Sequence, residues 1–186
     1  MNVRRTGLPG LLVIEPRVFS DSRGFFFETY NTARYAQAGL PERFVQDNHS
    51  ASIRGTVRGL HYQLHRPQAK LLRVIGGEIF DVAVDIRRGS PTFGRWEHVI
   101  LSAENKRQFF VPAGFAHGFC VVSDVAEVEY KCTDYYVADD QRGVRWNDPS
   151  LAIPWPVAER AAVLSERDRQ YALLTADRAD LPEYVP

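Results

Sequence analysis

Lysine and cysteine are scarce in this chain of 186 residues, and neither sign of charge is in excess. Its two cysteines, Cys120 and Cys132, are too few for a disulfide scaffold and form no CxxC pair, so a reducing cytoplasmic compartment is expected. Lys+Arg and Asp+Glu both number 23, which gives a formal net charge of 0. A balanced chain has no overall field to attract nucleic acid or an anionic membrane, and neither is expected as a partner.

Long apolar runs are also missing. The apolar start at 11–14 is cut off by Pro9, Gly10 and Glu15, which makes it too short for the core of a signal peptide, and no other run approaches a membrane span. Hydrophobic residues nevertheless make up 45% of the chain, which argues against disorder. With no repeat or linker, residues 1–186 are expected to form a single domain.

Short runs of alternating or β-branched apolar residues recur along the chain and are separated by turns rich in glycine and proline. This pattern predicts an all-β antiparallel sandwich or barrel. Two short helices are expected at 32–38 and 165–174, the second with the spacing of a capping box in Ser165-x-x-Asp168. The tail from Pro149 is expected to wrap the barrel. The expected strands are 11–15, 25–29, 57–63, 71–75, 78–86, 98–102, 108–111, 118–122 and 125–133.

The run 78–86 carries apolar residues on both faces. One face is expected to pack on the core and the other on a second sheet or a partner subunit. Two aspartates interrupt this run. Asp85 is interpreted as a solvated strand end, whereas Asp81 lies inside the run, where one interpretation is that it orients a histidine.

The densest polar group in the sequence is Arg58-Gly-Leu-His61-Tyr-Gln63, followed by Lys70, one of only three lysines. A second histidine, His117, follows a Pro-x-Gly turn that would fix its direction. Two histidines on neighbouring strands suggest zinc or iron, but Gln63 and Lys70 stand where further ligands are needed, and an ammonium beside a cation is unfavourable. A metal-free acid–base site is therefore preferred, and a hydrogen-bonded core histidine stays open for His117.

A histidine with a lysine nearby suits one reaction in particular. The imidazole can remove a proton from carbon next to a carbonyl, and the ammonium can stabilise the resulting enolate without any cofactor. Inversion at that carbon also needs a proton donor on the far face. The hydroxyls of Tyr130, Tyr135 and Tyr136 are candidates, although packing inside the barrel is the alternative for each.

Two further segments suggest ligand contacts. Arg23, beside Gly24, could approach a phosphate closely, or simply occupy a surface turn. The amides around Gln46 and Asn48 could bind the edge of a base, or lie solvated in a loop.

Taken together, these residues resemble those of the dTDP-4-dehydrorhamnose 3,5-epimerase family, along nearly the whole chain and in order. The motifs that carry the resemblance are Arg58-Gly-Leu-His-Tyr-Gln63, Gln68-Ala-Lys-Leu71, Phe80-Asp-Val-Ala-Val-Asp-Ile-Arg87, Gly89-Ser-Pro-Thr-Phe-Gly-Arg-Trp96, Val111-Pro-x-Gly-x-Ala-His-Gly-Phe119 and Trp146-Asn-Asp-Pro149. The resemblance implies a cupin-type jelly roll with short peripheral helices. It also implies epimerisation at C3′ and C5′ of dTDP-4-dehydro-6-deoxy-D-glucose in dTDP-L-rhamnose biosynthesis.

The resemblance also implies roles for individual residues. His61 would be the base, Asp168 its carboxylate partner, Tyr130 the acid on the opposite face and Lys70 the group that stabilises the enolate oxygen. It implies a homodimer with an exchanged N-terminal strand, and neither metal nor coenzyme. The implied contacts to substrate are Arg23 and Arg58 for the diphosphate, Phe19, Glu28, Gln46 and Asn48 on the nucleotide side, and His117 and Tyr136 beside the sugar.

The sequence departs from the family pattern at two positions. Ala138 stands where the family commonly has proline, and Gln141 stands where it commonly has glutamate, so a nucleotide contact at 141 is in doubt. Three alternatives stay open: a single-position epimerase acting at C3′ or C5′, a metal-dependent cupin, and a non-catalytic sugar-binding cupin.

Overall fold

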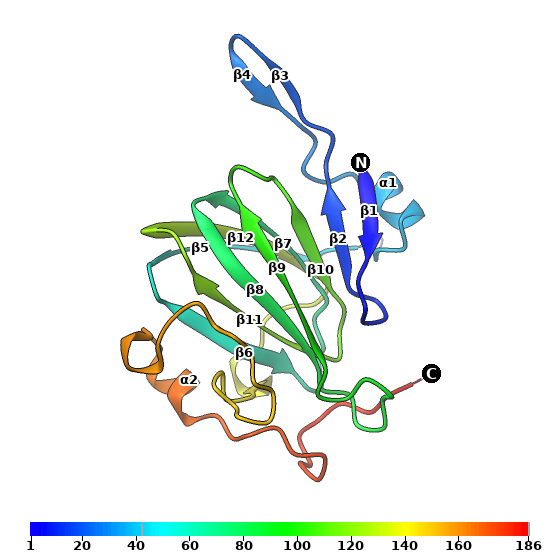
Figure 1. Ribbon diagram of the computed structural model, residues 1–186. Coiled ribbons are helices and arrows are strands. Elements are labelled where there is room, and N and C mark those ends of the chain that lie inside the picture. The colour runs from blue at the N-terminus through cyan, green and yellow to red at the C-terminus, as the bar shows by residue number, and fades with distance from the viewer. Residues whose placement is uncertain (42, 186) are drawn as a thin grey trace.

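Two antiparallel sheets face one another and form the body of the molecule (Figure 1). The computed structural model describes residues 1–41 and 43–185. The six-stranded sheet has the order β1 (Asn2–Arg5), β2 (Leu12–Glu15), β10 (Gln108–Val111), β7 (Lys70–Gly76), β12 (Val125–Cys132), β5 (Gln46–Ile53). The five-stranded sheet has the order β13 (Gln141–Gly143), β6 (Val57–Gln63), β11 (Phe115–Val121), β8 (Glu78–Asp85), β9 (Trp96–Ser102).

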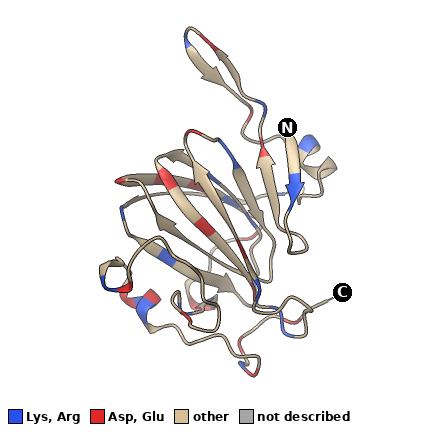
Figure 2. Cartoon of the chain, in the orientation of Figure 1, with Lys and Arg blue, Asp and Glu red and all other residues tan. Residues whose placement is uncertain are grey.

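The remaining elements of the described residues are short and peripheral. Strands β3 (Phe19–Asp21) and β4 (Gly24–Phe26) form a separate hairpin. The helices are α1 (Thr32–Gln37), α2 (Glu166–Gln170) and the 3₁₀ turns η1 (Ala138–Asp140) and η2 (Glu159–Ala161). No helix in the described part of the chain is long and apolar enough to cross a membrane. Basic and acidic residues are interspersed rather than gathered on one face (Figure 2).

The core lies between the two sheets and changes character along the strands. Side chains two apart share a face of a strand. On β7, Val74 and Leu72 are buried in the apolar core, and Lys70 follows them on the same face. On β12, Val128 belongs to the core and Tyr130 packs at its edge. The inward faces thus turn from apolar to polar at one end of the sandwich, and this is where a cavity opens.

The outer face of the five-stranded sheet is covered by the chain itself. Phe80, Val82 and Val84 on β8 pack in a buried cluster with Trp146, Leu151, Leu174 and Leu181 from the C-terminal segment. The sequence correctly predicted that both faces of this strand are covered and that the tail wraps the body. The expectation of a second sheet or a partner on the outer face was wrong, because the tail already fills that place.

Asp85 corrects a second expectation. Its side chain is fully buried instead of solvated. The carboxylate accepts hydrogen bonds from Arg87 Nε at 2.8 Å, Ser90 Oγ at 2.6 Å and Thr92 Oγ1 at 2.6 Å. These bonds lower the pKa of Asp85 against the opposing effect of burial. The residue holds the turn after β8 in place, because a buried carboxylate is tolerated only with such partners.

The β3–β4 hairpin projects away from both sheets (Figure 1). Its apolar side chains lie in solvent: Phe19 is 52% exposed, Phe25 60% and Phe26 72%. The expected strand at 25–29 therefore stops at Phe26, and its residues pair only with β3. An exposed cluster of large apolar side chains is unusual for a free surface and indicates a binding role.

Candidate active site

A cavity of about 330 Å³ opens between the sheets at their polar end. Its walls come from β5, β6, β7, β11, β12 and β13, together with the segments that precede β7 and β13. Eight of the twelve site residues expected from the sequence line it or its rim. Those eight are Gln46, Asn48, Arg58, His61, Lys70, His117, Tyr130 and Tyr136.

His61 on β6 is paired with a carboxylate from the far end of the chain. Its Nε2 lies 2.5 Å from Oδ1 of Asp168, which is buried at the first turn of α2. Ser165 caps this helix by accepting a hydrogen bond from the backbone N–H of Asp168, as the capping spacing predicted. The carboxylate itself is left free for the histidine. Burial lowers the pKa of His61, and the bond to Asp168 opposes that shift without reversing it.

The six-stranded sheet contributes Lys70 and Tyr130 from the neighbouring strands β7 and β12. Burial lowers the pKa of Lys70, which Cys132 and Asp81 partly counter. Burial raises the pKa of Tyr130, so the phenol keeps its proton near neutral pH. The cavity therefore has an imidazole on one sheet and a protonated phenol and an amine on the other.

His117 on β11 lies directly opposite His61 in the β6–β11 pairing. Its Nε2 is 2.8 Å from Oδ1 of Asp81, and both residues are buried. This contact confirms the interpretation that Asp81 orients a histidine. His117 is thus both a hydrogen-bonded core residue and part of the cavity wall.

The rim residues are held by short polar contacts. Gln46 donates from Nε2 to Oδ1 of Asn48 at 3.0 Å and accepts from the backbone N–H of Tyr136 at 2.8 Å. Arg58 donates from Nε to Oγ of Ser52 at 3.0 Å. All three residues line the cavity, so their polar groups are available to a polar ligand bound there.

Phe19, Arg23 and Glu28 lie outside this cavity. Phe19 and Arg23 line a shallow pocket on the exposed β3–β4 hairpin. The Arg23 guanidinium bonds to Asp21, and Glu28 forms an ion pair with Arg34 at 3.0 Å. These three residues therefore do not meet His61 within one copy of the chain.

Several cavity residues had no assigned role in the sequence. Ser50 follows Gln46 and Asn48 on the same face of β5, so a polar alternation of period two was the available signal. Gln141 lines the cavity and also bonds to Tyr171, which had been given no role. Four more residues complete the wall, and they stood in the motifs of the resemblance without being given a substrate contact: Tyr62, Gln63, Gln68 and Phe119. Within residues 1–41 and 43–185, no three His, Cys, Asp or Glu side chains are grouped so as to hold a metal ion.

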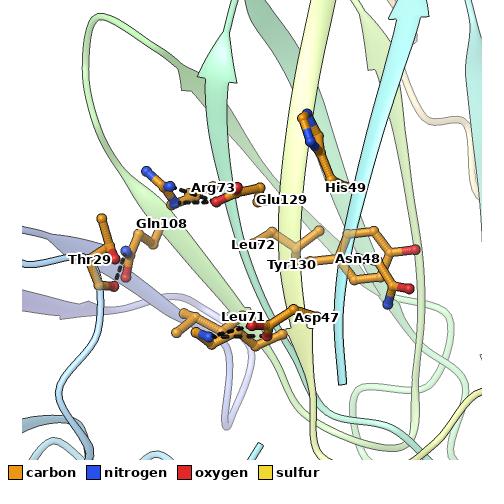
Figure 3. Close-up of a pocket in the computed structure, with 11 residues that line it drawn as sticks. Thr29, Asp47, Asn48, His49, Leu71, Leu72, Arg73, Gln108, Glu129 and Tyr130 are labelled. Carbon is orange, nitrogen blue, oxygen red and sulfur yellow. Dashed lines mark hydrogen bonds and ion pairs between the residues drawn. The ribbon is translucent and has the colours of Figure 1, made fainter. Parts of the chain in front are cut away.

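A second pocket, of about 210 Å³, lies on the outer face of the six-stranded sheet (Figure 3). Its charged side chains are already paired, Arg73 with Glu129 at 2.6 Å and Lys131 with Asp47 at 3.1 Å. Gln108 likewise donates to the carbonyl of Thr29 (Figure 3). Groups neutralised in this way are poorly suited to move protons, and the cavity around His61 is the candidate active site.

A family model for dTDP-4-dehydrorhamnose 3,5-epimerase matches residues 5–176. The chain belongs to this family. The epimerase is 57% identical over 171 residues to a dTDP-4-dehydrorhamnose 3,5-epimerase of Pseudomonas aeruginosa, covering 91% of this chain and 94% of that one. It acts as a dTDP-4-dehydrorhamnose 3,5-epimerase, an isomerase of dTDP-L-rhamnose biosynthesis.

Solved structures of the same family have the same fold as this chain. A crystal structure of a dTDP-6-deoxy-D-glucose-3,5-epimerase of Legionella pneumophila superposes with a TM-score of 0.95 at 51% identity, covering 100% of this chain and 99% of that one. This match confirms the cupin-type jelly roll. The chain is also 42% identical to a dTDP-4-dehydrorhamnose 3-epimerase of Streptomyces niveus, and the match covers 100% of this chain and 90% of that one. The name of that relative specifies epimerisation at one position only.

Proposed function

We propose that His61 removes the protons at C3′ and C5′ of dTDP-4-dehydro-6-deoxy-D-glucose, and that Tyr130 returns protons to the opposite face. The observation that carries this proposal is the placement of the two groups on facing walls of one cavity, His61 on β6 and Tyr130 on β12. Asp168 orients the imidazole through the 2.5 Å contact and stabilises its protonated form.

Each inversion is then a balanced pair of proton transfers. His61 takes the proton, and the C–H electron pair moves toward the C4′ carbonyl to give an enolate whose oxygen the Lys70 ammonium stabilises. The enolate collapses back to the ketone as carbon takes the Tyr130 proton from the other face. Solvent then reprotonates Tyr130 and deprotonates His61. The ketone serves as the electron sink, so the proposed steps use neither metal nor coenzyme.

The remaining cavity residues are proposed to hold the substrate. Arg58 would bind the diphosphate, because a guanidinium forms bidentate bonds to phosphate oxygens. Gln46 and Asn48 would bind the nucleotide, and His117 and Tyr136 would flank the hexose. The Legionella pneumophila relative was crystallised with dTDP-4-keto-L-rhamnose, which supports a substrate of this class.

Exchange of solvent deuterium tests the proposed chemistry. The enzyme is incubated with dTDP-4-dehydro-6-deoxy-D-glucose in D₂O, and the sugar is followed by proton NMR. Deuterium is expected at both C3′ and C5′. No incorporation at either carbon would refute enolisation, and incorporation at one carbon only would identify a single-position epimerase.

The pH dependence of kcat/KM is expected to be bell-shaped. The acid limb should lie below about 6.5, the ordinary pKa of histidine, because burial lowers the pKa of His61 and only the neutral imidazole accepts a proton. The alkaline limb should follow loss of the Lys70 ammonium, because burial lowers the pKa of Lys70 and raises that of Tyr130. In Lys70→Arg the cation persists at high pH, so the alkaline limb should disappear, although the absolute rate should be lower than in wild type. An alkaline limb that is unchanged in this variant would show that another group is responsible for it.

We also propose a homodimer in which the β3–β4 hairpin of each protomer covers the cavity of its partner. The hairpin supports this because it carries exposed phenylalanines away from its own body, while Phe19 and Arg23 lie remote from its own cavity. Strand β1 pairs with β2 of its own sheet, so the exchanged element would be the hairpin. A hairpin delivered in this way would bring Phe19, Arg23 and Glu28 to the nucleotide.

Complementation between two inactive variants tests the exchange. His61→Asn and Arg23→Ala are purified separately, then unfolded and refolded together. A mixed dimer has one intact site, with His61 from one protomer and Arg23 from its partner. The mixture is expected to regain about a quarter of wild-type activity, since about half of the dimers are mixed and each has one intact site of two. Activity no higher than the mean of the two variants, or a monomer in analytical ultracentrifugation, would refute the exchange.

Two broader proposals accompany this function. Residues 1–186 are proposed to form one domain, supported by a core to which both sheets contribute. A reducing cytoplasmic compartment is proposed for the enzyme, supported by Cys120 and Cys132, which are both free thiols.

A further inference from the structure

We propose that Tyr171, held by Gln141, is a positioning residue for His61 and that Gly143 is a glycine in order to admit the Tyr171 ring. The proposal rests on the proposed role of His61 as the base. Neither the capping pattern of α2 nor the motifs around His61 assigns anything to this tyrosine.

Strand β13 pairs with β6 at the edge of the five-stranded sheet. In this antiparallel pair Gly143 lies directly opposite His61, and Gln141 lies opposite Gln63. Directly opposed residues place their side chains on the same face of a sheet, a few ångströms apart. A side chain at position 143 would therefore stand next to the His61 imidazole, but glycine leaves that place empty.

The Tyr171 ring fills this place. A Cβ atom built on Gly143 would lie 2.4 Å from Cδ2 and Cε2 of Tyr171 and 2.6 Å from Cζ, distances that no real contact tolerates. The Tyr171 and His61 rings meet edge to face, with centroids 5.7 Å apart and planes at 71°. The aromatic ring thus takes the position of the missing cross-strand neighbour and limits rotation of the imidazole.

Hydrogen bonds hold both the side chain and the backbone of Tyr171 in place. Its hydroxyl accepts a hydrogen bond from Nε2 of Gln141 at 2.9 Å. Its backbone carbonyl accepts one from Nε of Arg145 at 3.2 Å. Gln141 is two residues before Gly143 on β13, so its side chain lies on the same face of the sheet.

Tyr171 follows α2 directly, three residues after Asp168. This short helix, which lies beside β6 (Figure 1), and the residue directly after it therefore supply two of the neighbours that fix His61. Asp168 holds Nε2 from one side, and the Tyr171 ring packs against the imidazole from another. Burial raises the pKa of Tyr171, so it stays a neutral phenol that leaves the charge of the base unchanged.

The test compares four variants: Tyr171→Ala, Tyr171→Phe, Gly143→Ala and the double variant Gly143→Ala/Tyr171→Ala. Tyr171→Ala is expected to lower kcat about 10- to 100-fold with KM within about twofold, because the base becomes mispositioned. Tyr171→Phe keeps the ring and loses one hydrogen bond, so kcat should stay within about fivefold of wild type. Gly143→Ala displaces the ring and should behave like Tyr171→Ala.

The double variant separates the proposal from a general loss of packing. If Gly143 serves only to admit the ring, the double variant should have the same kcat as Tyr171→Ala alone. Additive losses in kcat would overturn this relation. Circular dichroism melts identify any variant that fails to fold. Gly143→Ala displaces the Tyr171 ring and Tyr171→Ala removes it, so the two variants test the same contact independently.

The His61 ring titration, followed by ¹⁵N NMR, supplies a readout independent of turnover. Tyr171→Ala admits water beside the imidazole, so the pKa of His61 should rise toward its ordinary value, whereas Tyr171→Phe should leave it unchanged. An unchanged titration and kcat in Tyr171→Ala, with turnover still abolished by His61→Asn, would refute the positioning role alone. Turnover retained in both Tyr171→Ala and His61→Asn would instead refute the role of His61 as the base.

Discussion

His61→Asn is expected to lower kcat by about 10²–10⁴-fold, the usual cost of losing a positioned base. Asparagine keeps a polar side chain of similar reach but cannot accept a proton at neutral pH. Deuterium incorporation from D₂O should fall at both C3′ and C5′ by the same factor, because one imidazole is assigned to both carbons. The measurement is initial-rate kinetics combined with NMR of the sugar.

The matched control for this variant is His98→Asn. His98 is an exposed histidine on β9 that stacks on Phe80, at a centroid distance of 4.7 Å, and it does not line the cavity. Its substitution should leave kcat within about twofold of wild type, as surface changes usually do. Loss of exchange at only one carbon in His61→Asn would mean that a second base serves the other carbon.

Tyr130→Phe is expected to separate exchange from inversion. The ring keeps its packing against the core, but the hydroxyl that would protonate the far face is gone. His61 can still remove a proton and return a deuteron to the same face. The sugar should therefore take up deuterium without changing configuration, while epimer formation falls about 10²–10⁴-fold.

The control here is Tyr135→Phe, which removes a hydroxyl five residues away. Tyr135 is 52% exposed and does not line the cavity. Its loss should change neither exchange nor inversion. Equal losses of exchange and inversion in Tyr130→Phe would show that Tyr130 is needed for deprotonation itself, and would contradict its assignment as the acid on the opposite face.

Apolar alternation made most of the strands predictable from the sequence. The run 108–111 matches β10 residue for residue, and 57–63 matches β6. Strand β5 was interpreted as a loop, because its inward side chains are Gln46, Asn48 and Ser50. These polar residues face the cavity instead of the apolar core, so hydrophobic periodicity does not report them.

The candidate site was predictable in a different way. Local spacing pointed to His61, Lys70 and His117, but the contact between His61 and Asp168 joins residues 107 positions apart and came only from the family resemblance. Asp81 was recognised because an aspartate inside an apolar strand needs a partner. Tyr171 had no such signal, because an aromatic residue after a short helix is ordinary. Its role becomes visible only in the structure, where its ring occupies the space left by the missing side chain of Gly143.

The proposed exchange of the β3–β4 hairpin would place part of the binding site outside a single chain. Phe19 and Arg23 have the chemistry to bind a nucleotide diphosphate, yet they are far from His61 within their own protomer. No sequence pattern states whether a segment folds onto its own body or onto a second copy. That choice depends on the surface that an assembled dimer would bury.

A crystal structure of the enzyme with a bound dTDP-4-keto-6-deoxy sugar tests the central claim most directly. A His61 ring nitrogen and the Tyr130 hydroxyl should lie on opposite faces of the hexose, each within about 4 Å of C3′ or C5′. The Lys70 ammonium should point at the C4′ oxygen. A complex in which Tyr130 turns away from the sugar, or shares a face with His61, would contradict the account.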